Sequence, residues 1–293
     1  MMRHMFLQDP ILGRLLRLTD GRTVVDATLD CGIRLVTLCA EGRKNLFYRQ
    51  PGTFDDGLTT PEGWRLYGGH RLWAAPETDL TYCPDNDPVD WSLTETGVLL
   101  TQKPDPWQRL QKSVALSFQP DGSLSVCHTL KNCGDTPISA AAWVVSTLAP
   151  GGRATVPLHR HEVPSPGTPH RAFALWGTAT LGDPRLTLEK DALTVRQDGS
   201  VEDYFKLGIY SDEGRVDFEN LGQRLTVTFT PHPIGEYTDL GCNIELYANP
   251  RMQEVETLGV FRTLAPGDTV THTEHWLVTA LDRAVIVNQF ANW

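Results

Sequence analysis

The chain has 293 residues, of which 40% are hydrophobic and 21% are charged, and its formal net charge is −10. This composition is typical of a globular protein with a substantial core and disfavours a disordered or fibrous chain. The acidic balance argues against nucleic acid or an anionic membrane as a partner, because phosphate binding needs a basic surface. No window has the roughly eighteen apolar residues that cross a bilayer, and residues 1–13 lack a secretory signal pattern, so we expect a cytoplasmic protein.

Six cysteines are spread along the chain, without a CxxC metal motif or a dense disulfide framework. We therefore expect reduced and mostly buried thiols. The sequence also lacks a GxSxG nucleophile motif, a GxGxxG dinucleotide motif and a P-loop. These observations argue against a serine hydrolase and a nucleotide-binding enzyme, and we expect no cofactor and no bound metal.

The first predicted elements are a short segment with helical spacing at Ile11–Arg17 and two strands at Thr23–Leu29 and Ile33–Leu38. Gln50–Glu62 then carries proline, glycine and charge without a strand pattern, which predicts a loop inserted within the domain, with a linker between domains as the alternative. Throughout the chain, 20 prolines and 25 glycines interrupt short apolar runs. Such punctuation is typical of β structure.

A β-hairpin is predicted near the middle of the chain. Val114–Phe118 alternates apolar with smaller or polar residues, the PDGS sequence at 120–123 predicts a turn, and the alternation resumes over Leu124–Leu130. A nearly continuous apolar run follows at Ile138–Leu148. Such a run is expected of a strand that is covered on both faces, as between two stacked sheets.

A second predicted loop, Leu158–His170, precedes the remaining strands. Strand signals recur at Leu186–Val195, Leu225–Thr230, Cys242–Tyr247, Val255–Val260 and Val270–Val278. Besides Ile11–Arg17, only Asp282–Phe290 has helical spacing, which disfavours a parallel βαβ sheet. We predict an all-β protein, a large antiparallel two-sheet supersandwich in which residues 1–293 form a single domain.

The densest group of chemically useful residues is Tyr67–Trp73, with the sequence YGGHRLW, followed shortly by Glu77. Its two glycines permit close backbone approach beside His70 and Arg71. Sugar recognition needs such a mixture, since hydroxyls bind charged partners and the C–H faces of a sugar stack on aromatic rings. Trp64, Tyr67 and Trp73 are candidate platforms, although aromatic residues beside glycines more often pack in a core.

A second group of polar residues lies on two predicted strands near the C-terminal end. Glu245 and Tyr247 share one face of the first strand, and Glu254 and Glu256 share one face of the second. Carboxylates that point the same way repel each other, and crowding of this kind can raise a pKa and create a general acid or base. A solvated outer face is the alternative.

Several short sequences occur in an order that resembles a known family. They are CGIR at 31–34, NLF at 45–47, GGHRLW at 68–73 with APE at 75–77, PDN at 84–86, LKNCG at 130–134, APGG at 149–152, ELYAN at 245–249, ETLG at 256–259, LAPG at 264–267 and HTEHW at 272–276. Together they resemble a bacterial branch of the galactose mutarotase-like or aldose 1-epimerase proteins over nearly the whole chain.

The resemblance implies a two-sheet supersandwich that binds a sugar and interconverts its α and β anomers by opening the hemiacetal. In the family a glutamate takes the anomeric proton and a histidine protonates the ring oxygen. The resemblance makes Glu256 the first candidate for the base and Glu254 the second. The region Ile138–Trp143, where the family histidine is expected, contains none, so His70 is the best substitute acid.

Substrate binding is expected from the remaining polar and aromatic residues of these segments, which are Arg71, Trp73, Tyr67, Glu77, Glu245 and Lys206. Arg71 suits a hydroxyl or a sugar-acid carboxylate, with a surface salt bridge as the alternative. Lys206 has a solvated surface position as its alternative. His128 has the same strand parity as Leu124, Val126 and Leu130, which predicts that its side chain lies in the core. The expected partner is a small-molecule sugar, and the sequence sets no oligomeric state.

Two other functions compete with an epimerase. A non-catalytic carbohydrate-binding or sensing module on the same fold is favoured by the missing family histidine, and a lyase or another isomerase could use the same cleft. A metal-dependent, cupin-like enzyme is suggested by two clusters, which are His159, His161 and Glu162, and His272, Glu274 and His275. Neither cluster has the glycine-spaced pattern of a cupin.

Overall fold

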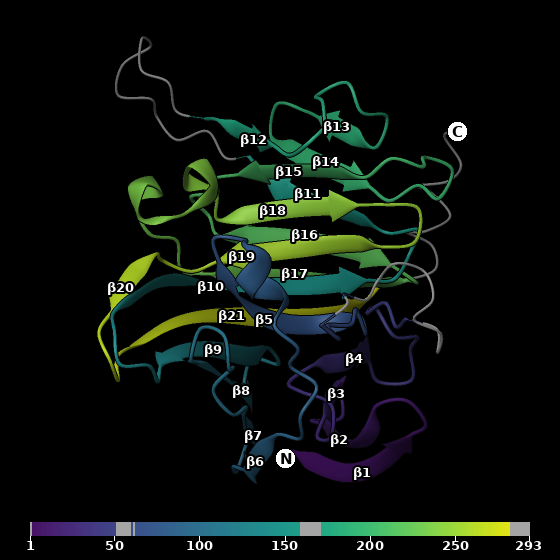
Figure 1. The fold of residues 1–293 in the computed structure, drawn as a ribbon. Helices are drawn as coiled ribbons and strands as arrows, with labels where there is room; N and C mark the ends of the chain where they lie inside the picture. The colour runs from purple at the N-terminus through teal and green to yellow at the C-terminus, as the bar shows by residue number, and fades with distance from the viewer. Residues whose placement is uncertain (1, 51–59, 61, 159–170, 282–293) are drawn as a thin grey trace.

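A computed structural model describes residues 2–50, 60, 62–158 and 171–281 of the chain. These residues form two antiparallel β-sheets and three short 3-10 helices, and the described part contains no α-helix. Figure 1 shows the sheets packed one behind the other, with β1 and β6 together at one end. The described residues also include no helix long and apolar enough to cross a membrane.

The first sheet has 11 strands, in the order β1-β2-β3-β4-β5-β10-β19-β18-β15-β12, with β20 pairing with β10. Their bounds are β1 Arg3–Asp9, β2 Gly13–Thr19, β3 Thr23–Thr28, β4 Leu35–Ala40, β5 Gly69–Ala75, β10 Ile138–Leu148, β12 Phe173–Leu175, β15 Phe205–Ile209, β18 Ile244–Ala248, β19 Gln253–Leu258 and β20 Arg262–Leu264.

The second sheet has 10 strands, in the order β13-β14-β11-β16-β17-β21-β9-β8-β7-β6. Their bounds are β6 Asp90–Leu93, β7 Gly97–Thr101, β8 Leu110–Phe118, β9 Leu124–Asn132, β11 Arg153–Pro157, β13 Leu186–Leu188, β14 Ala192–Arg196, β16 Arg215–Asn220, β17 Gln223–Phe229 and β21 Thr269–Ala280. The 3-10 helices are η1 Asp79–Tyr82, η2 Ile234–Glu236 and η3 Asp239–Gly241.

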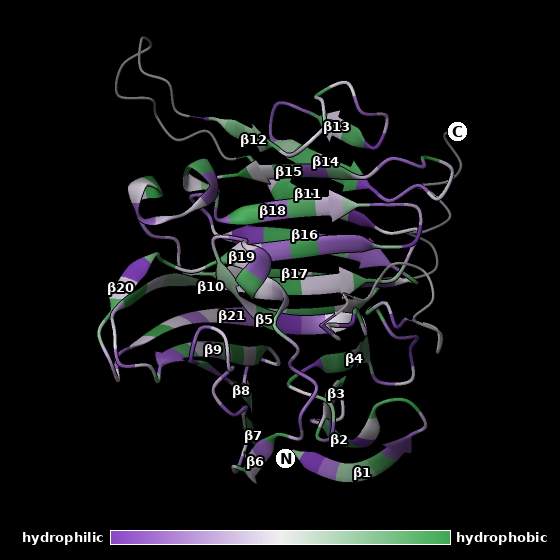
Figure 2. Ribbon diagram, in the orientation of Figure 1, coloured by the Kyte–Doolittle hydropathy of each residue, from purple (hydrophilic) through white to green (hydrophobic). Residues whose placement is uncertain are grey.

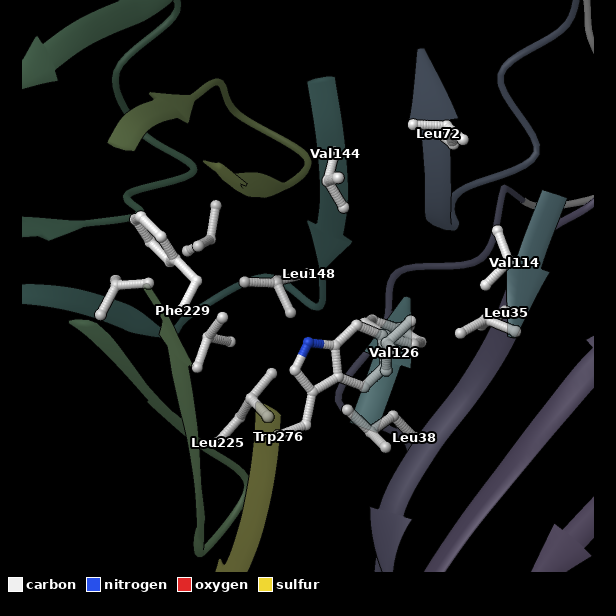
Figure 3. Close-up of a cluster of buried hydrophobic side chains, with 14 of the residues drawn as sticks. Leu35, Leu38, Leu72, Val114, Val126, Val144, Leu148, Leu225, Phe229 and Trp276 are labelled. Atoms are coloured by element: carbon white, nitrogen blue, oxygen red, sulfur yellow. The ribbon is translucent and has the colours of Figure 1, made fainter. Parts of the chain in front are cut away.

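The largest hydrophobic cluster lies between the sheets and draws on both of them. Strands of the second sheet bury every other residue, as β17 does, and Figure 2 shows the matching alternation of hydropathy. Figure 3 places Trp276 of β21 in this core, among Leu38, Val126 and Leu148. Period-two burial of this kind follows from successive side chains pointing to opposite faces of a strand.

The all-β, two-sheet prediction is confirmed, and so is the central hairpin, in which Phe118 of β8 pairs with Leu124 of β9. The helical spacing of Ile11–Arg17 was misleading, because the chain there enters strand β2. Leu16 packs between the sheets and Leu15 packs in a separate cluster on the other side. A strand buried on both faces therefore imitates the apolar spacing of a helix.

The predicted strand Leu186–Val195 is two strands, β13 and β14, that form a hairpin. The helical segment at Asp282–Phe290 lies outside the described residues, as does most of the predicted loops Gln50–Glu62 and Leu158–His170. All six cysteines are free, and four of them are buried, as expected.

Gly69 begins β5 with φ of +74°, and a Cβ atom there would lie 2.3 Å from the carbonyl oxygen of Leu35. Gly42 has nearly the same φ, +73°, but open space around it. We expect Gly42→Ala to cost about 1 kcal/mol of unfolding free energy from backbone strain alone. Gly69→Ala should cost about 3 kcal/mol, because displacement of the neighbouring backbone adds to the strain.

Urea unfolding of both variants checks this comparison. Equal losses would show that β4 yields to the added methyl group and that only the dihedral angle matters.

Candidate functional site

Five neighbouring strands of the first sheet, β5, β10, β19, β18 and β15, carry a second cluster of side chains on the face away from the second sheet. We call this the outer face. Strand parity places residues there, because Leu72 and Ala74 of β5 join the core between the sheets while Trp73 and Ala75 join the outer cluster. Arg71 has the same parity as Trp73. The outer face is therefore both aromatic and charged.

Lys206 of β15 lies at the centre of the charged groups. Its ammonium is 2.7 Å from a carboxylate oxygen of Glu245 and 2.9 Å from one of Glu256. Glu245 on β18 is directly opposite Glu256 on β19, and both are 1% exposed. The indole N–H of Trp143 also donates to Glu256, at 2.8 Å. One cation and one indole therefore hold two carboxyl groups that would otherwise repel each other.

Glu254 lies two residues before Glu256 and points to the same face. Its carboxylate accepts a hydrogen bond from the hydroxyl of Thr147 at 2.9 Å. Burial and the nearby charge of Glu256 raise the pKa of Glu254 to about 7. A carboxyl group with this pKa exists in both protonation states at neutral pH and can donate or accept a proton.

Arg71 of β5 is held by Asp85, whose carboxylate is 3.0 Å from its guanidinium. The same carboxylate pairs with Arg34 at 2.5 Å and lies 3.7 Å from the ammonium of Lys112 on β8. Burial lowers the pKa of Arg71 to about 10, opposed by the charge of Asp85, so the guanidinium remains charged at neutral pH.

Aromatic rings border this charged group. The guanidinium of Arg71 lies over Trp64 and Trp73, with 5.1 and 4.6 Å to the ring centroids. Trp73 also packs against Trp143 and against Tyr82 of η1. The ammonium of Lys206 lies 4.8 Å from the ring centroid of Trp143. Rings beside ionised groups present both stacking surfaces and hydrogen-bonding groups.

Several buried polar atoms of the outer face have no hydrogen-bond partner within the described part of the chain. They are Nε and Nη1 of Arg71, Nε1 of Trp64, Nε1 of Trp73 and Oε1 of Glu245. Most buried polar groups in proteins are satisfied, so each exception calls for an explanation. Four of these atoms are donors and one is an acceptor, which is the complement that a polyhydroxyl ligand offers.

An open cavity of about 700 Å³ borders this cluster on the side of Tyr82. Its lining residues are Thr60, Glu62, Asp79, Leu80, Tyr82 and Trp107. Tyr82 therefore faces the cavity as well as Trp64 and Trp73.

The structure brings together most of the predicted site residues. Glu245, Glu254, Glu256, Lys206, Arg71 and Trp73 lie on the outer face. Glu77 is exposed at its margin, where it accepts a hydrogen bond from Tyr82. Tyr67 is displaced from the group and packs in a third cluster, with its ring 4.7 Å from the guanidinium of Arg34.

His70, the expected substitute acid, does not join the candidate residues of the outer face, because it lies on the opposite side of β5 from Arg71. It is 1% exposed, and its ring contacts His128 and Trp276 in the core between the sheets. Burial lowers the pKa of His70 well below its usual value. The expectation that His128 is a core residue is confirmed, since it is fully buried.

The second cupin-like cluster does not form a common site. His272 and Glu274 of β21 are buried between the sheets, whereas His275 points to the opposite, exposed face. The first cluster, His159, His161 and Glu162, lies outside the described residues.

Trp143, Tyr82 and Asp85 are the residues that sequence analysis did not assign to the site. Trp143 lies within the apolar run Ile138–Leu148, where its indole N–H could not be distinguished from ordinary core packing. Asp85 belongs to the PDN sequence at 84–86, which contributes to the family resemblance but gives no indication of an ion pair. Its three cationic partners come from distant parts of the chain.

Comparison with solved structures defines the class of fold as a galactose mutarotase-like β-sandwich. A galactose mutarotase-like protein from Lactobacillus casei superposes with a TM-score of 0.59 and 13% identity, covering 90% of this chain and 100% of that one. A candidate aldose 1-epimerase from Escherichia coli K12 gives 0.60 and 12%, covering 96% and 100%.

A third solved structure, a TPR-domain containing protein from Parabacteroides distasonis, gives a TM-score of 0.64 at 16% identity. The match covers 92% of this chain and 48% of that one, so this chain spans about half of that longer protein. No protein-family model matches the sequence, and no curated protein sequence aligns with it significantly. At these identities the likeness establishes the fold alone.

Proposed function

We propose that this chain binds a sugar on its outer face and acts as an aldose 1-epimerase-like isomerase, with residues 1–293 as one carbohydrate-binding domain. The observation that carries the proposal is the convergence of Glu254, Glu256, Lys206 and Arg71 on one face beside aromatic rings. The galactose mutarotase-like fold is compatible with it, and so are the buried polar atoms of this face that lack partners.

In the proposed reaction Glu256 is the base and Glu254 is the acid. Lys206 and Trp143 both donate hydrogen bonds to the carboxylate of Glu256, which would accept the proton of the anomeric hydroxyl. Glu254, when protonated, donates its proton to the ring oxygen as the bond between that oxygen and the anomeric carbon breaks. The resulting aldehyde turns about the adjacent carbon–carbon bond, and the two proton transfers reverse as the ring closes.

The test is NMR saturation exchange between α and β anomer signals over a panel of aldoses. We expect the wild type to accelerate the exchange of at least one sugar, and Glu256→Gln to reduce that acceleration about 100-fold. Glu95→Gln, which changes an exposed carboxylate in the turn between β6 and β7, should retain it. Acceleration that survives in both Glu254→Gln and Glu256→Gln would contradict the assignment.

The pH dependence of exchange tests Glu254 separately. A carboxyl group with a pKa of about 7 carries its proton below that pH and loses it above. If Glu254 is the acid, kcat/KM should fall as the pH rises through about 7, and Glu254→Gln should remove this dependence. A wild-type profile that stays flat across neutral pH would exclude Glu254 as the acid.

A non-catalytic carbohydrate-binding module is the second candidate. The specific observation in its favour is that His70, His128 and His272 all face the core, so none of them supplies the acid that the family uses. Saturation transfer from the protein to a sugar, without accelerated anomer exchange, would decide for the binding module.

A further inference from the structure

A second polar cluster lies between the two sheets, behind the outer face. His70 of β5, His128 of β9 and Glu274 of β21 are each at most 2% exposed. One ligating atom from each lies within 4.8 Å of the other two, and the two imidazole Nε2 atoms are 2.7 Å apart. His70 belongs to the first sheet, whereas the other two residues belong to the second.

The other ring nitrogens of the two histidines are anchored. Nδ1 of His128 is 3.0 Å from the backbone carbonyl of His272, which can only accept, so Nδ1 carries the proton and Nε2 accepts a hydrogen bond from the Nε2–H of His70. Nδ1 of His70 is 2.8 Å from the hydroxyl of Ser146, which can donate or accept. Metal-binding histidines are held in this way, with the non-ligating nitrogen bonded to a carbonyl or a polar side chain.

The side chain of Glu274 is also held in place, and both of its hydrogen-bond partners act as donors. Its carboxylate accepts hydrogen bonds from the hydroxyl of Thr257 at 2.6 Å and from the indole of Trp276 at 2.8 Å. Within the described part of the chain it has no ion pair with a lysine or arginine. A carboxyl group that is ionised in a core is normally paired with a cation or bound to a metal, and one without such a partner favours its neutral form. The cluster therefore lacks a positive charge at the point where the three side chains meet.

We propose that His70, His128 and Glu274 form a binding site for a divalent transition-metal ion, with zinc as the reference ion, which links the two sheets. Two imidazole nitrogens and one carboxylate oxygen are a donor set for zinc and its neighbours, and calcium and magnesium prefer oxygen ligands alone. The inference does not depend on the proposed sugar chemistry, because none of the three residues lies on the outer face.

Binding requires one tautomer change and a small displacement. His70 moves its proton from Nε2 to Nδ1, and Ser146 turns its hydroxyl to accept it, so the ring stays neutral and both Nε2 lone pairs face the metal. Glu274 binds as a carboxylate, and if protonated it releases its proton to solvent. Ligand atoms on a tetrahedral zinc are about 3.3 Å apart, so the two imidazoles, now 2.7 Å apart, must separate by about 0.6 Å, and the carboxylate oxygen of Glu274, within 4.8 Å of both, must adopt the same spacing.

The test uses the full chain, purified, stripped with a chelator and titrated with zinc or cobalt(II). We expect about one zinc per chain by elemental analysis, a higher Tm with zinc, and visible d–d bands from cobalt in a site with nitrogen and oxygen ligands. His70→Gln and Glu274→Gln should lose these responses. Ser146→Ala, which removes only the anchor of His70, should weaken zinc binding about 10-fold.

His275→Gln is the matched control, because His275 lies next to Glu274 on β21 but points to the exposed face. It should bind zinc as the wild type does. A folded, metal-free wild type with no saturable zinc response and no cobalt bands would overturn the proposal, even if the ligand variants fail to fold. The proposal also fails if His275→Gln abolishes binding while His70→Gln and Glu274→Gln retain it.

Discussion

Replacing Asp85 with asparagine should destabilise the protein by about 3–5 kcal/mol, the typical cost of removing one partner from a buried ion pair. Asp85 is the carboxylate shared by Arg34, Arg71 and Lys112, whose side chains are 1%, 3% and 12% exposed. Asparagine keeps the size of the side chain but removes its charge. Three buried cations would then face one another without a countercharge, and the ion pairs that join Asp85 to Arg71 of β5 and Lys112 of β8 would be lost.

Urea unfolding followed by tryptophan fluorescence measures this loss of stability, with Asp87→Asn as the control, since Asp87 is exposed and lies two residues away.

The cationic neighbours hold the pKa of Asp85 well below its usual value, although burial alone would raise it. Its stabilisation is therefore present above the ordinary aspartate pKa and is lost as the pH falls below it. The wild type should lose this contribution in acid, and Asp85→Asn should not. If Asp85→Asn costs less than about 1 kcal/mol of unfolding free energy at neutral pH, solvent must screen the three cations in place of the carboxylate.

The sequence was sufficient to predict which carboxylates share a face. Glu254 and Glu256, and likewise Glu245 and Tyr247, are separated by two positions, and the alternation of side chains along a strand puts each pair on one side. The second sheet was also predictable in outline, because its strands bury only one face. Alternating burial in β8 and β9 corresponds directly to alternating hydropathy.

The assignment of His70 failed for a physical reason. Every residue of β5 is buried, so the sequence GHRLWAA gives no indication of which parity faces the core and which faces the site. Both faces of this strand are covered, one by the second sheet and the other by Trp64 and Tyr82. Only the contacts of His70 with Trp276 and His128 decide its direction.

Interactions between distant segments were equally inaccessible. The partners of Asp85 lie 51 residues before it in one case and 14 residues before it in another, and no local spacing connects them. The same holds for Lys206, which is 50 residues from Glu256. Sequence patterns assign residues to faces of strands, and the order of strands in the sheet then determines which faces meet.

Replacing Lys206 with methionine should destabilise the protein by about 3–5 kcal/mol in weakly alkaline solution, because Glu245 and Glu256 would be left buried, adjacent and unpaired. The loss should be smaller in weak acid. Burial and the charge of Glu256 already raise the pKa of Glu245 in the folded state, and loss of the ammonium removes the group that opposes this rise, so the folded variant takes up a proton that the unfolded chain does not bind. Stability is then recovered as the pH falls and lost as it rises.

Adding Glu245→Gln to Lys206→Met separates charge from packing. The double variant retains a single carboxylate, Glu256, which still accepts the hydrogen bond of Trp143, so it should recover part of the lost stability in alkaline solution. Urea unfolding of both variants at the two pH values measures this recovery. A loss that is independent of pH and unchanged in the double variant would instead assign the role of Lys206 to the contact of its ammonium with the rings of Trp143 and Trp176. In that case the two carboxylates would be held by groups other than the ammonium, and the proposed ionised state of Glu256 would lose its main support.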